Sequence, residues 1–177
     1  MDRPTRPLAD LQLGDMVRPL GAVESLALSG ISVDSRTTKP GHLFAAMPGT
    51  NAHGATFASF ALRMGAVAVL TDAEGVALLE QEFGSLPAPV LLAENPRRAL
   101  ALAAANWFGA QPETIVAVTG TNGKTSVSTF ARQIFEALGE AAVNFGTTGV
   151  EGAVVAALSH TTPEPLTLHK LLADLAA

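Results

Sequence analysis

Short apolar runs alternate with amphipathic stretches along most of the chain. The apolar runs are bounded by Gly, Pro, Asp or Ser, a pattern that predicts buried strands, whereas apolar positions three or four apart predict helices. Strands are expected at residues 30–34, 42–47, 66–72, 88–94, 114–118 and 141–146. Helices are expected at residues 55–65, 73–84, 96–108, 124–138 and 163–177. Strands that alternate with helices predict an α/β fold.

Glycine, proline and asparagine mark where several of these elements begin or end. Asn95 followed by Pro96 is typical of a helix N-cap and a first helical residue. Gly109 follows the last apolar position of that helix, and glycine commonly ends helices. Further along, residues 147–160 predict a hairpin that turns at the Glu151-Gly152 pair.

A short polar segment, GAQPE at residues 109–113, predicts a linker between two domains, at residues 1–111 and 112–177. The second of these holds one complete strand–loop–helix. A buried parallel strand needs helices on both faces of its sheet, and this segment cannot supply them. The chain is therefore expected to be the front part of a longer protein, with a natural short relative as the alternative.

Composition narrows the class of protein. The 177 residues are 48% hydrophobic and 15% charged, which is ample for a globular core. The net charge of −5 disfavours a general nucleic-acid binder, which needs an excess of Lys and Arg. The apolar runs are shorter than the roughly 20 residues of a membrane span, and no secretion signal is visible. There is no cysteine, so we expect a cytoplasmic protein without disulfides.

The stretch VTGTNGKTS, residues 118–126, has the composition of a phosphate-binding loop between a strand and a helix. In such loops the backbone N–H groups and a helix N-terminus surround the phosphates, a lysine reaches the β/γ oxygens, and Ser or Thr holds Mg²⁺. Gly123-Lys124-Thr125 fits the end of the Walker A pattern. Val118, however, occupies the position of its first glycine. The alternative is a glycine-rich turn with an exposed lysine.

Three stretches together resemble the Mur ligases, the ATP-dependent amide-forming enzymes of bacterial cell-wall precursor synthesis. TGTNGKTS resembles their ATP loop, and ISVDSRTTKPGHLFAAMPGTNAHG resembles the UDP-binding segment shared by the third and fourth ligases. SHTTPEPLTLHKLLADL resembles the third, which adds an amino acid to UDP-N-acetylmuramoyl-L-alanyl-D-glutamate. The resemblance implies an amino-terminal UDP-binding α/β domain followed by the start of a P-loop central domain.

The resemblance also implies a reaction. The γ-phosphoryl group of ATP passes to the D-glutamyl carboxylate, and the amine of meso-diaminopimelate or L-lysine then attacks the acyl phosphate. Lys124 would be the catalytic residue, and Thr125 would bind Mg²⁺. The implied ATP-binding residues are Gly120, Thr121, Asn122, Gly123, Lys124, Thr125 and Ser126.

The implied contacts with the UDP-linked substrate lie in three segments. They are Val33, Ser35, Gly49, Thr50, Asn51, Ala52, His160, Thr161 and Thr162. The family often has asparagine where this chain has His160. Two of the segments have a purely structural alternative, because Asp34-Ser35 could form a side-chain-capped turn and Thr161-Thr162-Pro163 a plain helix start.

Two other functions remain open from the sequence. The chain could belong to the D-Ala-D-Ala-adding Mur ligase, or it could be a non-catalytic nucleotide-binding module. For the ligase we expect ATP, Mg²⁺, the UDP-muramoyl dipeptide and an amino acid as ligands. We expect the full-length protein to be a monomer. We also expect it to take part in peptidoglycan synthesis, cell shape and cell division. The 177 residues alone are expected to be inactive.

Overall fold

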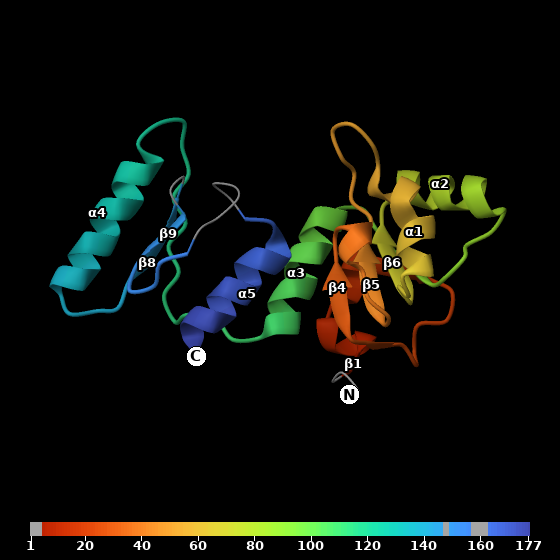
Figure 1. Ribbon diagram of the computed structural model, residues 1–177, viewed down its shortest axis with the longest axis horizontal. Helices are drawn as coiled ribbons and strands as arrows, with labels where there is room; N and C mark the ends of the chain where they lie inside the picture. The colour runs from red at the N-terminus through yellow and green to blue at the C-terminus, as the bar shows by residue number, and fades with distance from the viewer. Residues whose placement is uncertain (1–4, 147–148, 157–162) are drawn as a thin grey trace. The chain divides into compact units, whose positions relative to one another are not determined.

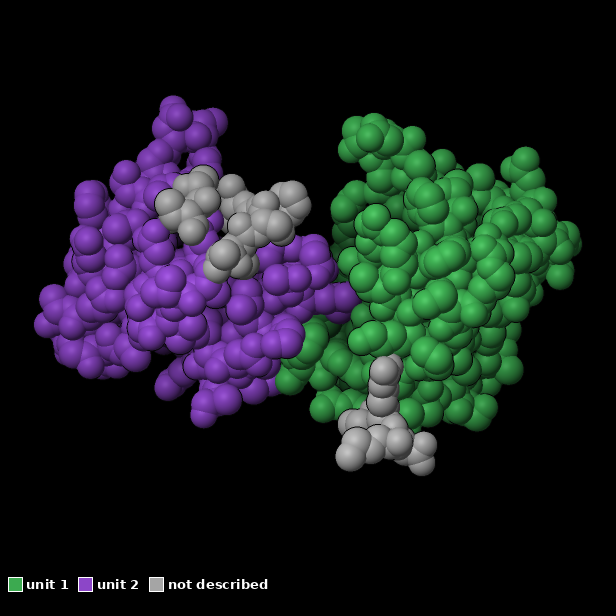
Figure 2. Space-filling model, viewed as in Figure 1, with its two compact units in different colours: residues 1–109 green, residues 110–177 purple. Residues whose placement is uncertain are grey.

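A computed structural model describes residues 5–146, 149–156 and 163–177 of the chain. The chain divides into two compact units, Met1–Gly109 and Ala110–Ala177 (Figure 2). Within the described residues, no helix is long and apolar enough to cross a membrane.

The first unit is built on a five-stranded sheet in the order β2-β7-β6-β5-β4. Four of its strands are parallel: β4 (Gly30–Ser32), β5 (His42–Ala45), β6 (Ala68–Thr71) and β7 (Val90–Ala93). All four residues of β6 are buried, as expected for an inner parallel strand that is covered on both faces. These strands confirm the α/β fold, although each is shorter than its apolar run.

Three α-helices follow the parallel strands: α1 (Ala58–Arg63), α2 (Ala73–Phe83) and α3 (Pro96–Phe108). A 3-10 turn, η4 (Gly54–Phe57), precedes α1, so the helix expected at residues 55–65 begins in this tighter form. α1 and α2 lie on one side of the sheet and α3 on the other (Figure 1). The expected caps of α3 are confirmed, since the Asn95 side chain accepts a hydrogen bond from the Arg98 N–H at 3.0 Å and Gly109 follows the last turn.

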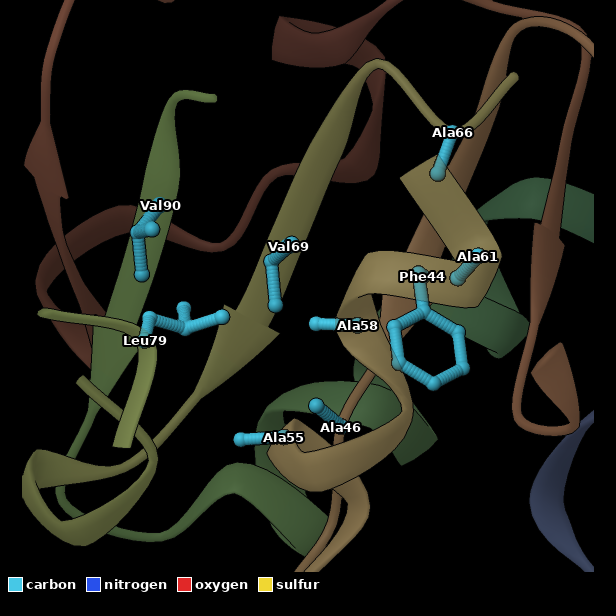
Figure 3. Close-up of a cluster of buried hydrophobic side chains, with 9 residues drawn as sticks. All are labelled: Phe44, Ala46, Ala55, Ala58, Ala61, Ala66, Val69, Leu79 and Val90. Carbon is cyan, nitrogen blue, oxygen red and sulfur yellow. The ribbon is translucent and has the colours of Figure 1, made fainter. Parts of the chain in front are cut away.

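The core under α1 and α2 combines small helix residues with larger strand residues (Figure 3). Ala55, Ala58 and Ala61 recur every third residue on the buried side of η4 and α1. Because the alanine side chain is only a methyl group, this helix can approach the sheet closely. Phe44 and Val69 fill the remaining space. The complete cluster is Phe44, Ala46, Ala55, Ala58, Ala61, Ala66, Val69, Leu79 and Val90.

The amino-terminal segment adds strands that the pattern did not predict. β2 (Val17–Leu20) pairs antiparallel with β7 at the edge of the sheet, and β1 (Arg6–Pro7) pairs with β3 (Ala27–Leu28). Two 3-10 turns, η1 (Leu8–Leu11) and η2 (Gly14–Met16), lie between β1 and β2. β2 contains a proline, which sheets tolerate at an edge, and it has no apolar run of its own.

The second unit holds α4 (Lys124–Ala137), the hairpin β8 (Val143–Gly146) with β9 (Gly149–Gly152), and α5 (Pro165–Ala176). The helix expected at residues 124–138 is confirmed, and Arg132 holds it to β8 through Nε and the Asn144 Oδ1 at 2.8 Å. α5 begins two residues later than expected because Glu164 is its N-cap and accepts hydrogen bonds from the N–H groups of Leu166 and Thr167.

One expectation for this unit was wrong, and another was right except for the position of a turn. Residues 114–118 form no strand, and the side chains of Ile115 and Val116 are 54% and 66% exposed. A strand forms only beside another strand, and the described residues of the unit supply none next to this segment. The chain does reverse within the expected hairpin, because Val150 pairs antiparallel with Ala156, but the turn lies later than expected, since Glu151 and Gly152 belong to β9.

Candidate functional site

The loop before α4 has the backbone of an anion-binding loop. Gly120 and Gly123 have φ angles of 147° and 78°, which residues with a Cβ rarely adopt. Gly123 is the N-cap of α4, whose first main-chain hydrogen bond runs from the Val127 N–H to the Gly123 carbonyl at 2.9 Å. The preceding N–H groups, at residues 124–126, therefore have no acceptor within the helix and are exposed donors for a ligand.

Lys124 adds a full positive charge to this loop. Its Nζ donates hydrogen bonds to the carbonyl oxygens of Gly120 at 2.6 Å and Thr121 at 3.2 Å, so the ammonium group lies over the loop. The first turn of α4 holds no acidic residue. The partial positive charge of the helix N-terminus and the ammonium group therefore act together, an arrangement that favours a polyphosphate.

Thr125 and Ser126 are exposed at the start of α4. A hydroxyl at this position suits Mg²⁺ when phosphate oxygens and water complete the coordination, because Mg²⁺ commonly takes few protein ligands. The described residues contain no cluster of three His, Asp or Glu side chains that could hold a metal by themselves. Thr125 thus fits a metal that is bound together with phosphates.

In the first unit, Asp34 shapes the turn that carries Ser35. Its side chain caps the 3-10 helix η3 (Ser35–Thr37) by accepting a hydrogen bond from the Arg36 N–H at 2.9 Å. The Arg36 guanidinium also donates to both carboxylate oxygens, with Nη2 to Oδ2 at 2.6 Å. These hydrogen bonds hold the pKa of Asp34 below its usual range. The capped turn expected as an alternative is present, and it places Ser35 beside a pocket.

The pocket is open, has a volume of about 610 Å³, and lies over the end of β5 and the start of α1. Its lining combines the apolar side chains of Val33, Phe57 and Phe60 with the polar side chains of Asp34, Ser35 and Arg36. The full lining is Val33, Asp34, Ser35, Arg36, Phe44, Gly54, Phe57 and Phe60. A lining that combines apolar and polar side chains suits a planar base attached to a charged group.

Two residues of this lining, Phe57 and Phe60, were not predicted from the sequence as site residues. Phe57 and Phe60 are spaced three apart in a predicted helix, which is the pattern of a buried face. The two residues are nevertheless 51% and 41% exposed. The signal that could have found them is the neighbouring set of alanines, which already fills the buried face of the same helix.

The other predicted contacts are distributed differently. Gly49, Thr50, Asn51 and Ala52 form an exposed loop after β5 and do not line the pocket. The loop is closed by a hydrogen bond of 2.8 Å from the Gly54 N–H to the Met47 carbonyl, and Gly54 does line the pocket. His160, Thr161 and Thr162 lie outside the described residues.

Family models cover most of the chain. Residues 27–108 match the model of the Mur ligase family, catalytic domain, and residues 118–177 match the Mur ligase middle domain. The chain belongs to the Mur ligase family. The glycine-rich loop before α4 lies in the middle-domain match, and the residues that line the pocket lie in the other.

Several relatives share one name. The chain is 51% identical over 156 residues to the UDP-N-acetylmuramoyl-L-alanyl-D-glutamate--2,6-diaminopimelate ligase of Mesorhizobium japonicum, covering 88% of this chain and 31% of the relative. It is 43% identical over 171 residues to the ligase of the same name from Brucella melitensis, covering 96% of this chain and 34% of the relative. The chain thus spans about a third of the length of these curated relatives.

Solved structures agree on the fold. A UDP-N-acetylmuramoyl-L-alanyl-D-glutamate--2,6-diaminopimelate ligase superimposes with a TM-score of 0.72 at 26% identity, covering 98% of this chain and 34% of that one. MurF from Acinetobacter baumannii superimposes with a TM-score of 0.52 at 18% identity, covering 78% and 29%. The second likeness shows a shared fold alone.

Proposed function

We propose that this Mur ligase chain carries the UDP- and ATP-binding parts of an enzyme that joins 2,6-diaminopimelate to UDP-N-acetylmuramoyl-L-alanyl-D-glutamate. The observation that carries the proposal is the identity of 51% over 88% of the chain to a relative of that name. The phosphate loop and the pocket support it with the two kinds of site that the reaction needs.

The proposal assigns one substrate to each domain. Residues 1–111 bind the UDP-linked substrate through Val33, Ser35 and residues 49–52. Residues 112–177 bind ATP through residues 120–126. His160, Thr161 and Thr162 are assigned to the peptide end of the UDP-linked substrate on the resemblance alone.

The chemistry begins with the D-glutamyl carboxylate, because an amine does not form an amide with an unactivated carboxylate at neutral pH. A carboxylate oxygen attacks the γ-phosphorus of ATP, and ADP leaves. The amine of the amino acid attacks the resulting acyl phosphate, the C–O bond to phosphate breaks, and an amide and inorganic phosphate remain. The transferring phosphoryl group needs donors placed around its oxygens.

The chain's own groups can supply that stabilisation. The N–H groups of residues 124–126 and the Lys124 ammonium all lie at one loop, so they can donate to β- and γ-phosphate oxygens. The Thr125 hydroxyl would hold Mg²⁺, which neutralises charge on those oxygens when bound. Because these donors are already in place on a helix N-terminus, the loop needs little rearrangement as charge develops.

A chimera tests this proposal. The matching segment of the Mesorhizobium japonicum ligase is replaced by this chain, and phosphate release is measured with UDP-muramoyl dipeptide, ATP and diaminopimelate. We expect turnover, and we expect Lys124→Ala to lower it by at least about 10²-fold because the phosphoryl group loses its positive partner. Lys170→Ala is the matched control, since Lys170 is an exposed lysine of α5 outside the loop.

Three outcomes would overturn parts of the proposal. A folded chimera without turnover contradicts the assignment and favours a non-catalytic nucleotide-binding module. Turnover with D-Ala-D-Ala in place of diaminopimelate favours the fourth ligase. Equal activity of the Lys124→Ala and parent chimeras removes the phosphate-loop role.

A further inference from the structure

The exposed loop of residues 48–53 ends on a buried histidine. The imidazole of His53 is only 5% exposed, and both of its nitrogens have partners. Nδ1 accepts a hydrogen bond from the Ala55 N–H at 3.0 Å, so this nitrogen carries no proton. Nε2 therefore carries the proton of the neutral ring and donates it to Asp72 Oδ1 at 3.0 Å.

Asp72 connects this histidine to a second element. The same oxygen, Oδ1, accepts the Gly75 N–H at 2.9 Å, which makes Asp72 the N-cap of α2. The pair thus links the loop that follows β5 to the turn between β6 and α2. A parallel link runs beside it, since Thr71 Oγ1 donates to the Ala46 carbonyl at 2.8 Å.

The ring is enclosed as well as hydrogen-bonded. A Cβ at Gly75 would lie 2.7 Å from Cε1 of His53, so the first turn of α2 approaches the ring as closely as glycine allows. A Cβ at Gly54 would lie 2.7 Å from the Met47 nitrogen, at the point where the loop closes. The His53 side chain therefore has little room to move without moving the loop.

The other end of the loop is also held. An Arg97 guanidinium nitrogen, from the first turn of α3, donates to the Pro48 carbonyl. Residues 49–52 between these two anchors are exposed, whereas Gly54, directly after His53, lines the pocket. The His53 ring is therefore fixed where the exposed residues 49–52 join Gly54, which lines the pocket together with Ser35.

We propose that His53 is a positioning residue, which through Asp72 holds residues 49–52 in the conformation that receives the diphosphate end of a uridine diphosphate ligand. The inference rests on the proposed function, because it takes the pocket as the UDP site. It goes further by assigning a role to two residues that need not contact the ligand. A loop held in its binding conformation loses less entropy when the ligand binds.

Substitutions can separate the two hydrogen bonds of the ring. His53→Asn keeps an acceptor near Nδ1 and removes the donor to Asp72, whereas His53→Gln reaches the position of Nε2 and can keep that donor. Asp72→Ser keeps an N-cap for α2 but is too short to reach His53. Asn106→Ala is the matched control, because it deletes one hydrogen bond of the same unit, to the Leu11 carbonyl at 2.7 Å.

The test titrates uridine diphosphate against the 177-residue chain and its variants, well below their melting temperatures. We expect His53→Asn and Asp72→Ser each to weaken binding by roughly 2- to 13-fold, the range for one lost hydrogen bond. The double variant should be no weaker than either single one, since both remove the same link. His53→Gln should recover part of the affinity, and Asn106→Ala should bind like the wild type.

A purely stabilising role would lower the melting temperature and leave the affinity unchanged. Wild-type affinity in the folded His53→Asn and Asp72→Ser variants therefore overturns the inference. Losses that add in the double variant overturn the link between the two residues. If the wild-type chain itself binds no uridine diphosphate, the UDP site is overturned, and the role of His53 falls with it. Failure of the UDP site is thereby distinguished from failure of the His53 role alone.

Discussion

At the scale of single residues, the turn at Asp34-Ser35 places a capping residue next to a residue that lines the pocket. The sequence offers Asp34-Ser35 either as a capped turn or as a substrate contact. In the structure Asp34 makes the turn, and Ser35, which is 9% exposed, lines the pocket next to it. The structural and the functional interpretations therefore concern neighbouring residues, and the turn is what directs Ser35 to the pocket.

Replacing Ser35 by alanine tests the hydroxyl alone. We expect the affinity for UDP-muramoyl dipeptide to fall by about 2- to 13-fold, because one neutral hydrogen bond contributes about 0.5–1.5 kcal/mol. Titration calorimetry on both proteins measures the difference. Ser29→Ala is a suitable control, since its hydroxyl donates to the Pro40 carbonyl at 2.6 Å and does not line the pocket. Equal affinities of wild type and Ser35→Ala would remove Ser35 from the site.

At the scale of elements, helices form where local signals are strong, even where their apolar face remains exposed. α4 begins at the expected lysine and is preceded by a glycine N-cap. Its apolar stripe, however, remains exposed at Val127, Phe130, Ile134 and Leu138. α5 buries only Leu172, and its His169 accepts a hydrogen bond from Gln111 Nε2 at 3.3 Å.

The second unit should therefore lose stability in mild acid. Burial lowers the pKa of His169 from its usual 6.5, so the unfolded chain binds this proton at a higher pH than the folded chain does. Stability is then complete above pH 6.5, falls as the pH drops toward the folded pKa, and levels off below it. Urea titrations that follow α5 across this pH range measure the effect. A His169→Gln variant should show a smaller dependence, and an identical dependence would contradict the assignment.

At the scale of the whole molecule, the two units differ in how much apolar surface they bury. The first unit has an apolar core on both faces of its sheet, whereas the described residues of the second bury only Val150 and Leu172 among their large apolar side chains. Because burial of apolar surface is the main source of stability, the first unit should resist opening better than the second. The segment at residues 110–119 contains no helix or strand.

Digestion with a glutamate-specific protease tests this difference. Glu113 is the one acidic residue within residues 109–123 and is exposed, so we expect early cleavage after it and a resistant product containing the first unit. Mass spectrometry identifies the products over time. Glu113→Gln should remove the early cut. Equally rapid cleavage within α2, at Glu80 or Glu82, would show that the first unit has no such advantage.

The amino-acid sequence determined the elements whose cause is local. Continuous apolar runs predicted β5, β6 and β7, because an inner parallel strand that is covered on both faces carries apolar side chains on both. Asn95 and Gly109 located the ends of α3 through their own conformational preferences. Gly120 and Gly123 likewise permit the positive φ angles of the loop before α4, since few other residues adopt those angles.

Only the tertiary structure decided the features that depend on distant partners. β2 exists because β7 offers it an edge, and residues 114–118 stay irregular because no strand lies beside them. Phe57 and Phe60 line the pocket because alanines already occupied the buried face of their helix. His53 meets Asp72, 19 residues away, only when two parallel strands lie side by side. Local pattern cannot encode such pairings, because strand pairing and burial are properties of two segments together.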